Sequence, residues 1–201
     1  SHFVVPNHII VGNGVLNEAA PILKKMGNKA FIVTGKHVAV SDMMKKLISL
    51  LDENDIRYVV FDGITGEPDD VMIENGVDLL KNSDCDFIIG IGGGSPLDSA
   101  KAIAAMAVND GSISDYNGKE ISGEILPLAA IPTTAGTGSE ATKFTVITDS
   151  QKGIKMLLKG DVLVPKLAIV DSEFTVSSPK SVTAATGLDA LTHAVEAYTS
   201  K

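Results

Sequence analysis

A glycine-rich stretch at residues 88–98 is the clearest candidate ligand-binding segment, with the sequence IIGIGGGSPLD. It contains three consecutive glycines, Gly92, Gly93 and Gly94. Such a run allows a backbone turn that a ligand can approach without meeting a side chain. Ser95 is a favourable N-cap, Pro96 suits the first helical position, and Asp98 completes a capping box. We therefore predict a strand, a turn and a helix whose first N–H groups bind a phosphate.

The glycine spacing differs from the common dinucleotide-binding fingerprint. From Gly90 to Gly94 the pattern is one residue short, and no acidic residue stands clearly about 20 positions further on. The alternative is a tight turn into a capped helix that binds nothing. Three consecutive glycines exceed what capping requires, which favours phosphate binding.

A second polar segment follows the apolar run at 128–131. Its hydroxyl-bearing residues are Thr133, Thr134, Thr137 and Ser139. Gly136 and Gly138 leave the backbone between them open. Ligands of open α/β sheets bind outside the carboxyl ends of the strands, so we predict that this segment contacts the same ligand. An ordinary polar loop is the alternative.

A carboxylate and an imidazole occur four positions apart near the end of the sequence. Asp189 and His193 would share one face of a helix. Their oxygen and nitrogen donors suit Fe²⁺ or Zn²⁺ better than Ca²⁺. By itself, such a pair is more often a surface hydrogen bond than a metal site.

The positions of these candidate residues depend on the elements around them. Apolar runs predict strands at 30–34, 58–61, 87–91 and 128–131, and helical spacing predicts helices at 42–54, 69–81 and 96–108. This alternation is typical of an α/β fold, in which a parallel sheet is covered by helices on both faces. The runs are continuously apolar, as expected of strands that are buried on both sides. We expect a Rossmann-like nucleotide domain.

The alternation of strands and helices ends after the predicted strand at 128–131. Short strands at 145–148, 154–158 and 167–170 predict a hairpin and a return to the sheet. A helical pattern then begins, with Ser178 as a cap, Pro179 at the first helical position and Gly187 as a break or kink. We expect a dinucleotide-binding domain at 1–176 and the truncated first helix of an all-helical metal-binding domain at 177–201.

The net charge and the cysteine content indicate which partners and which cellular compartment to expect. The 201 residues carry a formal net charge of −8, and an acidic surface repels nucleic-acid phosphates and anionic lipids. We therefore expect neither nucleic acid nor membrane as a partner. The single cysteine, Cys85, lies between Asp84 and Asp86, which disfavour a thiolate. One cysteine, with no spanning apolar run and no signal pattern, indicates a cytoplasmic protein.

Three motifs together resemble the iron-dependent (group III) alcohol dehydrogenases. They are GGGSPLDSAK at 92–101, PTTAGTGSE at 132–140 and GLDALTHAVE at 187–196. Their order and spacing are similar to the family pattern over essentially the whole chain. The resemblance implies a longer protein, with an N-terminal nucleotide domain, a C-terminal all-helical domain and an active site in the cleft between them.

The resemblance also implies a metal held by one Asp and three His. Asp189 and His193 match the first two ligands, and two further histidines are expected beyond Lys201. The metal would be Fe²⁺ or Zn²⁺, acting as a Lewis acid on the alcohol oxygen while the nicotinamide takes the hydride. No separate catalytic side chain is assigned. We expect the 201 residues by themselves to fold, to hold little metal and to be inactive.

The cofactor contacts implied by the resemblance fall on the same segments. The glycine turn with Ser95 and Asp98 would hold the pyrophosphate, the threonine segment would contact the nicotinamide end, and Lys155 would lie near its ribose. Many NAD-preferring relatives carry an Asp where this chain has Gly35. Lys36 and His37 follow it, which predicts a preference for NADP(H) over NAD(H). A second departure is Glu67, where some relatives have Asn.

Two other functions stay open from the sequence. One is a glycerol-dehydrogenase-like or dehydroquinate-synthase-like enzyme of the same fold. The other is a non-catalytic nucleotide-binding module, which describes the isolated 201 residues well. For the enzyme, the expected partner is a small-molecule alcohol or aldehyde, and a homodimer is possible.

Overall fold

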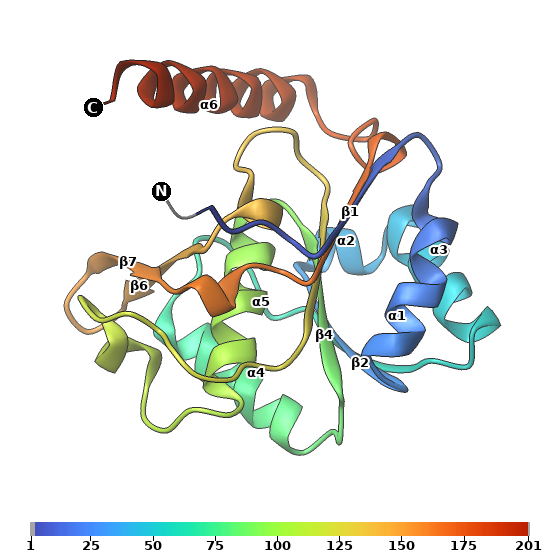
Figure 1. Ribbon diagram of the computed structural model, residues 1–201, viewed down its shortest axis with the longest axis horizontal. Coiled ribbons are helices and arrows are strands. Elements are labelled where there is room, and N and C mark those ends of the chain that lie inside the picture. Colours follow the sequence, from blue (N-terminus) through green and yellow to red (C-terminus); the bar gives the residue numbers. More distant parts are fainter. Residues whose placement is uncertain (1–2, 201) are drawn as a thin grey trace.

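A parallel six-stranded sheet forms the centre of the computed structural model, which describes residues 3–200 (Figure 1). The strand order is β1-β8-β5-β4-β2-β3. These strands are β1 (His8–Gly12), β2 (Lys29–Val33), β3 (Arg57–Phe61), β4 (Phe87–Gly92), β5 (Leu128–Pro132) and β8 (Leu167–Asp171). The parallel Rossmann-like sheet expected from the sequence is confirmed. Residues 1–2 and 201, at the outer ends of the two expected domains, lie outside the described part.

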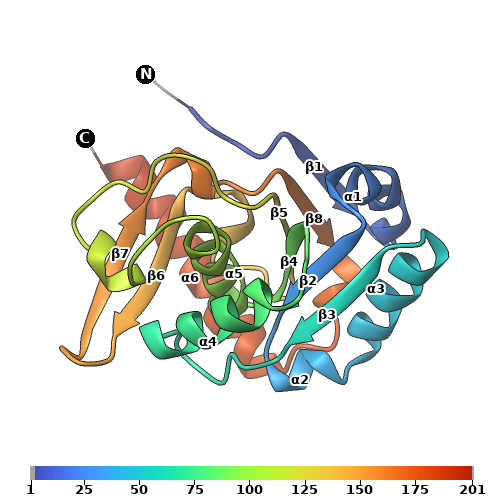
Figure 2. The same ribbon diagram turned by 90° about the horizontal axis from the view of Figure 1, so that it is seen from below.

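Helices cover both faces of this sheet. The α-helices of the described residues are α1 (Ala20–Met26), α2 (Lys36–Ala39), α3 (Asp42–Glu53), α4 (Asp70–Lys81), α5 (Gly94–Met106) and α6 (Lys180–Thr199). Figure 2 shows α1 and α3 on one side of the sheet and α4 and α5 on the other. No helix in residues 3–200 combines the length and the apolar character needed to span a bilayer.

Alternate residues of the central strands supply two separate cores. Phe31 and Ile88 pack with α4 and α5, whereas Ile32 and Ile89 pack with α1 and α3. All six residues of β4 are buried. A strand with helices on both faces has no solvent side, which explains why these runs are continuously apolar.

The starts of α3 and α4 follow from their capping residues. Ser41 accepts a hydrogen bond from the Met44 N–H, and Asp69 accepts one from the Met72 N–H. The helices predicted at 42–54 and 69–81 are therefore confirmed to within one residue at each end.

The sequence patterns did not predict β1 or α1. β1 is an edge strand with mostly exposed side chains, so it lacks the buried run that marks the other strands.

The predicted hairpin is present outside the main sheet. β6 (Phe144–Asp149) and β7 (Ile154–Lys159) pair antiparallel as a separate two-stranded sheet. The chain then returns to the main sheet as β8, between β1 and β5. Met156 and Leu158 of the hairpin are buried in the same core as α5, which seats the hairpin against that helix.

The predicted cap of α5 is wrong. The helix begins at Gly94, two residues earlier than expected, with Gly93 as N-cap and no side-chain cap. Gly92 has φ +147°, a conformation that L side chains rarely adopt, and the chain therefore turns before Ser95. The Asp98 carboxylate is bound elsewhere and forms no capping box.

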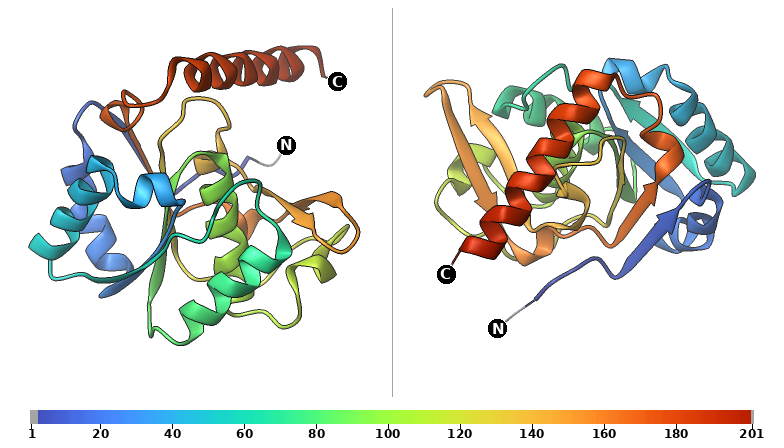
Figure 3. Two further views of the ribbon diagram at one scale, coloured as in Figure 1. Left: turned by 180° about the vertical axis from the view of Figure 1, so that it is seen from behind. Right: turned by 90° about the horizontal axis from the view of Figure 1, so that it is seen from above.

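Helix α6 departs from the prediction in two ways. Its N-cap is Pro179, and the Ser178 hydroxyl donates instead to the Thr133 carbonyl oxygen at 3.2 Å. Gly187 lies inside one continuous helix and does not end it. Figure 3 shows α6 crossing the molecule over the loops at one end of the sheet. None of its described residues is buried, and its apolar residues Leu188, Leu191 and Val195 are exposed.

Candidate functional site

The glycine turn and the threonine segment meet because β4 and β5 are neighbours. Their parallel register pairs Gly92 with Pro132 at the carboxyl ends of the two strands. The Thr133 N–H donates to the Gly92 carbonyl oxygen at 2.9 Å and extends this pairing. Segments about forty positions apart in the sequence therefore form one edge.

Side chains of the threonine segment pack against the turn itself. A Cβ built on Gly94 would lie 2.9 Å from the Thr137 methyl carbon. One built on Gly92 would lie 2.6 Å from a Pro96 ring carbon. A Cβ on Gly93, however, would meet only Thr134, at an ordinary 3.5 Å. Gly92 and Gly94 are thus required by packing, whereas Gly93 leaves space on the ligand side.

The start of α5 offers free hydrogen-bond donors. Within residues 3–200, the backbone N–H groups of Gly94 and Ser95 have no hydrogen-bond acceptor. The first intrahelical bond is from the Leu97 N–H to the Gly93 carbonyl oxygen. Exposed N–H groups at a helix N-terminus form a site for an anionic group such as a phosphate. The pyrophosphate contact expected at Gly93 to Ser95 has a fitting backbone here.

Asp98 faces the protein rather than open space. Its carboxylate accepts from the Ser139 hydroxyl at 2.5 Å and from the Val146 N–H at 2.9 Å. Burial raises the pKa of this carboxyl, and the two hydrogen bonds and nearby Lys101 oppose that rise. Both oxygens are therefore occupied, and the carboxylate joins α5 to the threonine segment and the hairpin.

Lys101 is a fully buried lysine that the sequence analysis gave no role. Its amine donates to the carbonyl oxygens of Thr142 and Phe144, each at 2.8 Å, and to the Thr142 hydroxyl at 3.1 Å. Burial lowers the pKa of Lys101 to about 8. Its neighbours on the helix are alanines, and a lone charge on an otherwise apolar stretch is the signal that could have identified it.

The region expected to select the cofactor lies at the ends of β2 and β3. Gly35 forms a bridge with Gly63, which directly follows Asp62. The backbone of Asp62, at the end of the neighbouring strand, is therefore next to this bridge, a neighbour that the local sequence around Gly35 does not reveal. A Cβ on Gly35 would lie 2.8 Å from the Ile64 carbonyl oxygen. Lys36 and His37 follow in α2.

Lys155 and Glu67 form an ion pair at 2.6 Å between amine and carboxylate, with both side chains largely exposed. Lys155 belongs to β7, and Glu67 to the loop between β3 and α4. The Thr148 N–H also donates to the Pro68 carbonyl oxygen at 2.8 Å. The two positions that the sequence analysis treated separately are therefore partners, and the ion pair helps to fasten the hairpin to this loop.

Asp189 and His193 lie on the same face of α6, as their spacing predicts. The distance between His193 Nε2 and Asp189 Oδ1 is 3.7 Å, and both side chains are about half exposed. Residues 3–200 contain no group of three or more His, Cys, Asp or Glu side chains that could hold a metal. The two donors fit Fe²⁺ or Zn²⁺ chemically, although structural and catalytic sites for such metals use more protein ligands.

Helix α6 approaches the threonine segment in its first half. A Cβ on Gly136 would lie 2.6 Å from the Thr186 carbonyl oxygen. This close contact lies one helical turn before Asp189. The candidate metal pair is therefore carried by the helix that passes directly over the candidate nicotinamide segment.

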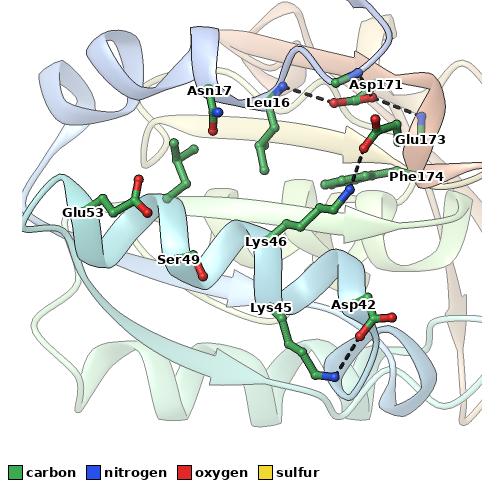
Figure 4. A pocket seen from close by; sticks show the side chains of 12 residues that line it. Leu16, Asn17, Asp42, Lys45, Lys46, Ser49, Glu53, Asp171, Glu173 and Phe174 are labelled. Atoms are coloured by element: carbon green, nitrogen blue, oxygen red, sulfur yellow. Dashed lines mark hydrogen bonds and ion pairs between the residues drawn. The ribbon is translucent and has the colours of Figure 1, made fainter.

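A cavity of about 560 Å³ lies away from these residues, between α3, the turn after β1 and the turn after β8 (Figure 4). Its polar groups largely satisfy one another. Lys46 pairs with Glu173 at 2.5 Å, and the Asp171 carboxylate accepts from the Gly14 and Leu16 N–H groups. It contains none of the predicted site residues, so we treat it as structural.

A glycine turn before a helix N-terminus, at the carboxyl edge of a parallel sheet, is typical of nucleotide-binding α/β folds. The family model described as "Iron-containing alcohol dehydrogenase" matches residues 6–172. This chain belongs to that family, which confirms the resemblance; the matched residues contain the first two motifs.

Similar proteins share sequence over the whole chain. It is 39% identical to the NAD-dependent methanol dehydrogenase of Bacillus methanolicus, over 100% of this chain and 53% of that protein. It is 43% identical to alcohol dehydrogenase 4 of Schizosaccharomyces pombe, over 100% of this chain and 48% of that protein. The chain thus spans about half the length of these relatives.

Solved structures agree in fold. A 1,3-propanediol oxidoreductase superposes with a TM-score of 0.92 at 35% identity, over 98% of this chain and 52% of that one. A sulfoacetaldehyde reductase from Bifidobacterium kashiwanohense, solved in complex with NAD⁺, gives 0.88 at 35% identity, over 97% and 52%. The family implies a metal and a nicotinamide cofactor. The relatives' names that specify a dinucleotide give NAD, and they do not support a preference for NADP.

Proposed function

We propose that this chain is the cofactor-binding part of an NAD(P)-dependent, metal-dependent oxidoreductase that interconverts an alcohol and an aldehyde or ketone. The observation that carries the proposal is the free N–H pair of Gly94 and Ser95, set against the threonine segment at one sheet edge. Family membership supports the reaction class. The metal, when bound, supplies Lewis acidity toward the alcohol oxygen.

In this proposal each segment has one task. Gly93, Gly94 and Ser95 hold the pyrophosphate through backbone N–H groups. Thr133, Thr134, Thr137 and Ser139 form the wall beside the nicotinamide, and Lys155 reaches the nicotinamide ribose. Together they align the nicotinamide with the reacting carbon and limit its movement, which is the entropic part of catalysis. Asp189 and His193 contribute two of the metal's ligands.

The division of the chain belongs to the same proposal. Residues 1–176 form the dinucleotide-binding domain, and 177–201 begin a helical metal-binding domain. Support comes from α6, which buries none of its described residues against the sheet. The isolated 201 residues then act as a nucleotide-binding module without turnover. The similar proteins quoted above are alcohol or propanediol dehydrogenases and a sulfoacetaldehyde reductase, so no observation favours the glycerol-dehydrogenase-like or dehydroquinate-synthase-like alternative.

We also propose that NADP(H) binds more tightly than NAD(H). The support is the absence of a side chain at Gly35, with the basic residues Lys36 and His37 beside it. Asp62 and the relatives' names argue in the opposite direction. The test is calorimetric titration of the chain with NADPH and with NADH.

A matched pair of variants sharpens that comparison. Gly35→Asp is unsuitable, because its Cβ would meet the Ile64 carbonyl oxygen. Lys36→Ala should weaken NADPH about fivefold and leave NADH within about twofold, since only NADPH carries the 2′-phosphate. Lys25→Ala, on the exposed surface of α1, is the control. Tighter NADH binding by the unaltered chain would refute the preference.

The proposed function itself is tested with the intact reading frame and the 201-residue chain side by side. The intact protein should reduce NAD(P)⁺ in the presence of an alcohol and Fe²⁺ or Zn²⁺. The 201-residue chain should bind the dinucleotide without turnover. A 201-residue chain that binds neither NAD⁺, NADP⁺ nor ADP would contradict the assignment of the glycine turn.

A further inference from the structure

Two charged residues one turn apart on α5 hold the segment that follows the threonines. Asp98 accepts from the Ser139 hydroxyl and the Val146 N–H through its carboxylate, and its backbone carbonyl accepts from the Thr145 hydroxyl at 2.8 Å. Lys101 donates to Thr142 and Phe144, as described above. Contacts from these two residues therefore fasten the chain from 139 to 146, which we call the tethered segment.

The Lys101 amine has no carboxylate partner within ion-pair distance among the described residues. Its acceptors are two carbonyl oxygens and one hydroxyl, which match the three hydrogens of an ammonium group. Asp98 and Glu140 act on it only from a distance, and Lys143 of the tethered segment pairs instead with Asp161. A buried charge held only by neutral acceptors of one segment is well suited to fix that segment's position.

The tethered segment is connected to the glycine turn through Thr137. The Ser139 N–H donates to the Thr137 hydroxyl at 3.4 Å, and the Thr137 methyl lies against Gly94. A shift of Ser139 would therefore carry Thr137 away from the N-terminus of α5. Because Asp98 and Lys101 belong to the same helix as that N-terminus, one rigid element sets both sides of the site.

We propose that Lys101 and Asp98 are positioning residues that keep the threonine segment at its distance from the glycine turn and so shape the nicotinamide side of the site. This inference rests on the proposed function. Neither residue needs to touch the cofactor. Core packing does not favour charge at these positions, because burying a charged group costs free energy.

Comparing a nicotinamide dinucleotide with ADP distinguishes a positioning role of Lys101 from a general loss of structure. A nicotinamide dinucleotide spans both sides of the site, whereas ADP carries only the diphosphate and adenosine. In Lys101→Met we expect the Kd of the tighter-binding dinucleotide to rise about tenfold and the Kd of ADP to change less than about twofold. Lys25→Met is the control, because Lys25 is exposed and has no side-chain partner among residues 3–200. Equal weakening of both ligands would overturn the positioning role.

Milder variants keep the test decisive should Lys101→Met fail to fold. Thr142→Val removes one of three Lys101 acceptors, and Asp98→Asn keeps an acceptor for only one of its two carboxylate donors. Both should raise the dinucleotide Kd about threefold and spare ADP. Unchanged dinucleotide affinity in both would also overturn the proposal.

Hydrogen exchange provides a readout that needs no cofactor. Amides of the tethered segment should exchange about tenfold faster in the Lys101 or Asp98 variants, whereas those of β2 and β4 should be unchanged. Uniform acceleration, or none in 139–146, would contradict the inference. If the unaltered chain binds neither dinucleotide nor ADP, the proposed function fails, yet the exchange result still decides whether these residues hold the segment.

Discussion

The three glycines of the turn, Gly92, Gly93 and Gly94, are glycine for different physical reasons. Gly92 needs its positive φ and the space beside Pro96, and Gly94 needs the space beside Thr137. Gly93 has an extended conformation and room for a Cβ. Packing alone therefore does not explain Gly93, and the approach of a ligand to the backbone does.

Gly93→Val should consequently leave the fold intact and remove cofactor binding. We expect the midpoint of thermal unfolding to change by less than about 4 °C. The Kd for the dinucleotide should rise at least about tenfold, because the side chain would occupy the phosphate's place. Gly187→Val on α6, where a Cβ meets nothing within 4 Å, is the control. Retained affinity in Gly93→Val would place the pyrophosphate elsewhere.

Lys101 gives a pH dependence whose sign follows from its burial. Burial lowers its pKa from 10.5 to about 8, so the unfolded chain binds more protons than the folded chain between these values. The contribution of Lys101 to the free energy of unfolding is therefore constant below pH 8 and rises with pH up to 10.5. The charge that hydrogen-bonds the tethered segment is thus held at an energetic cost at neutral pH.

Urea unfolding of the chain and of Lys101→Met across this window provides the measurement. The free energy of unfolding of the unaltered chain minus that of Lys101→Met should rise with pH, by at most about 1.4 kcal/mol per pH unit. Lys25→Met, at an exposed position of α1, is the matched control. A difference that falls as pH rises would show that Lys101 is stabilised as the charged form.

Among the elements, α5 and α6 differ in how they are supported. α5 packs on the sheet, on α4 and on the hairpin, and most of its residues from Leu97 to Met106 are buried. α6 approaches the threonine segment closely where Thr186 meets Gly136, and its apolar residues Leu188, Leu191 and Val195 are exposed. Tertiary packing supplies most of a helix's stability in proteins, so the folding of the sheet should not depend on α6.

Removal of residues 180–201 tests this difference. A chain that ends at Pro179 should unfold within about 3 °C of the full 201 residues, because no described residue of α6 is buried. Leu47→Ala in α3 is the comparison, since Leu47 is fully buried. That change should destabilise the chain by about 2–5 kcal/mol. A large loss on removing α6 would mean that it packs firmly on the sheet.

For the whole molecule, the sheet edge and the candidate metal pair lie on elements that are packed very differently. The glycine turn is built from the packed sheet, whereas Asp189 and His193 lie on a helix with no buried face. A site for Fe²⁺ or Zn²⁺ with only two protein ligands is weak. The 201-residue chain should therefore bind the dinucleotide while it retains little metal.

Metal content and turnover provide that experiment. The 201-residue chain, incubated with Fe²⁺ or Zn²⁺ and desalted, should retain far less than one equivalent by elemental analysis. It should also show no alcohol-dependent reduction of NAD(P)⁺. Asp189→Asn should leave both results and the dinucleotide affinity unchanged, whereas in the intact protein it should abolish turnover. Stoichiometric metal with turnover in the 201 residues would refute the need for further ligands.

The sequence by itself determined the sheet, the glycine turn and the family. Continuously apolar runs specify doubly covered strands, and apolar residues at helical spacing specify α3 and α4. These signals are local, because each rests on neighbours within one or two turns. The edge strand β1 was missed for the same reason, since its exposed side chains carry no such signal.

The tertiary structure alone decided which distant residues meet. Strand order places Gly92 beside Pro132, and this neighbourhood brings Thr137 against Gly94. The partners of Asp98 and Lys101 lie 41 to 48 residues further along the chain. Local pattern therefore assigned Asp98 to a capping box and left Lys101 without a role. The hydrogen-bond partners of a buried charge come from segments that the fold brings together, so a short stretch of sequence does not reveal them.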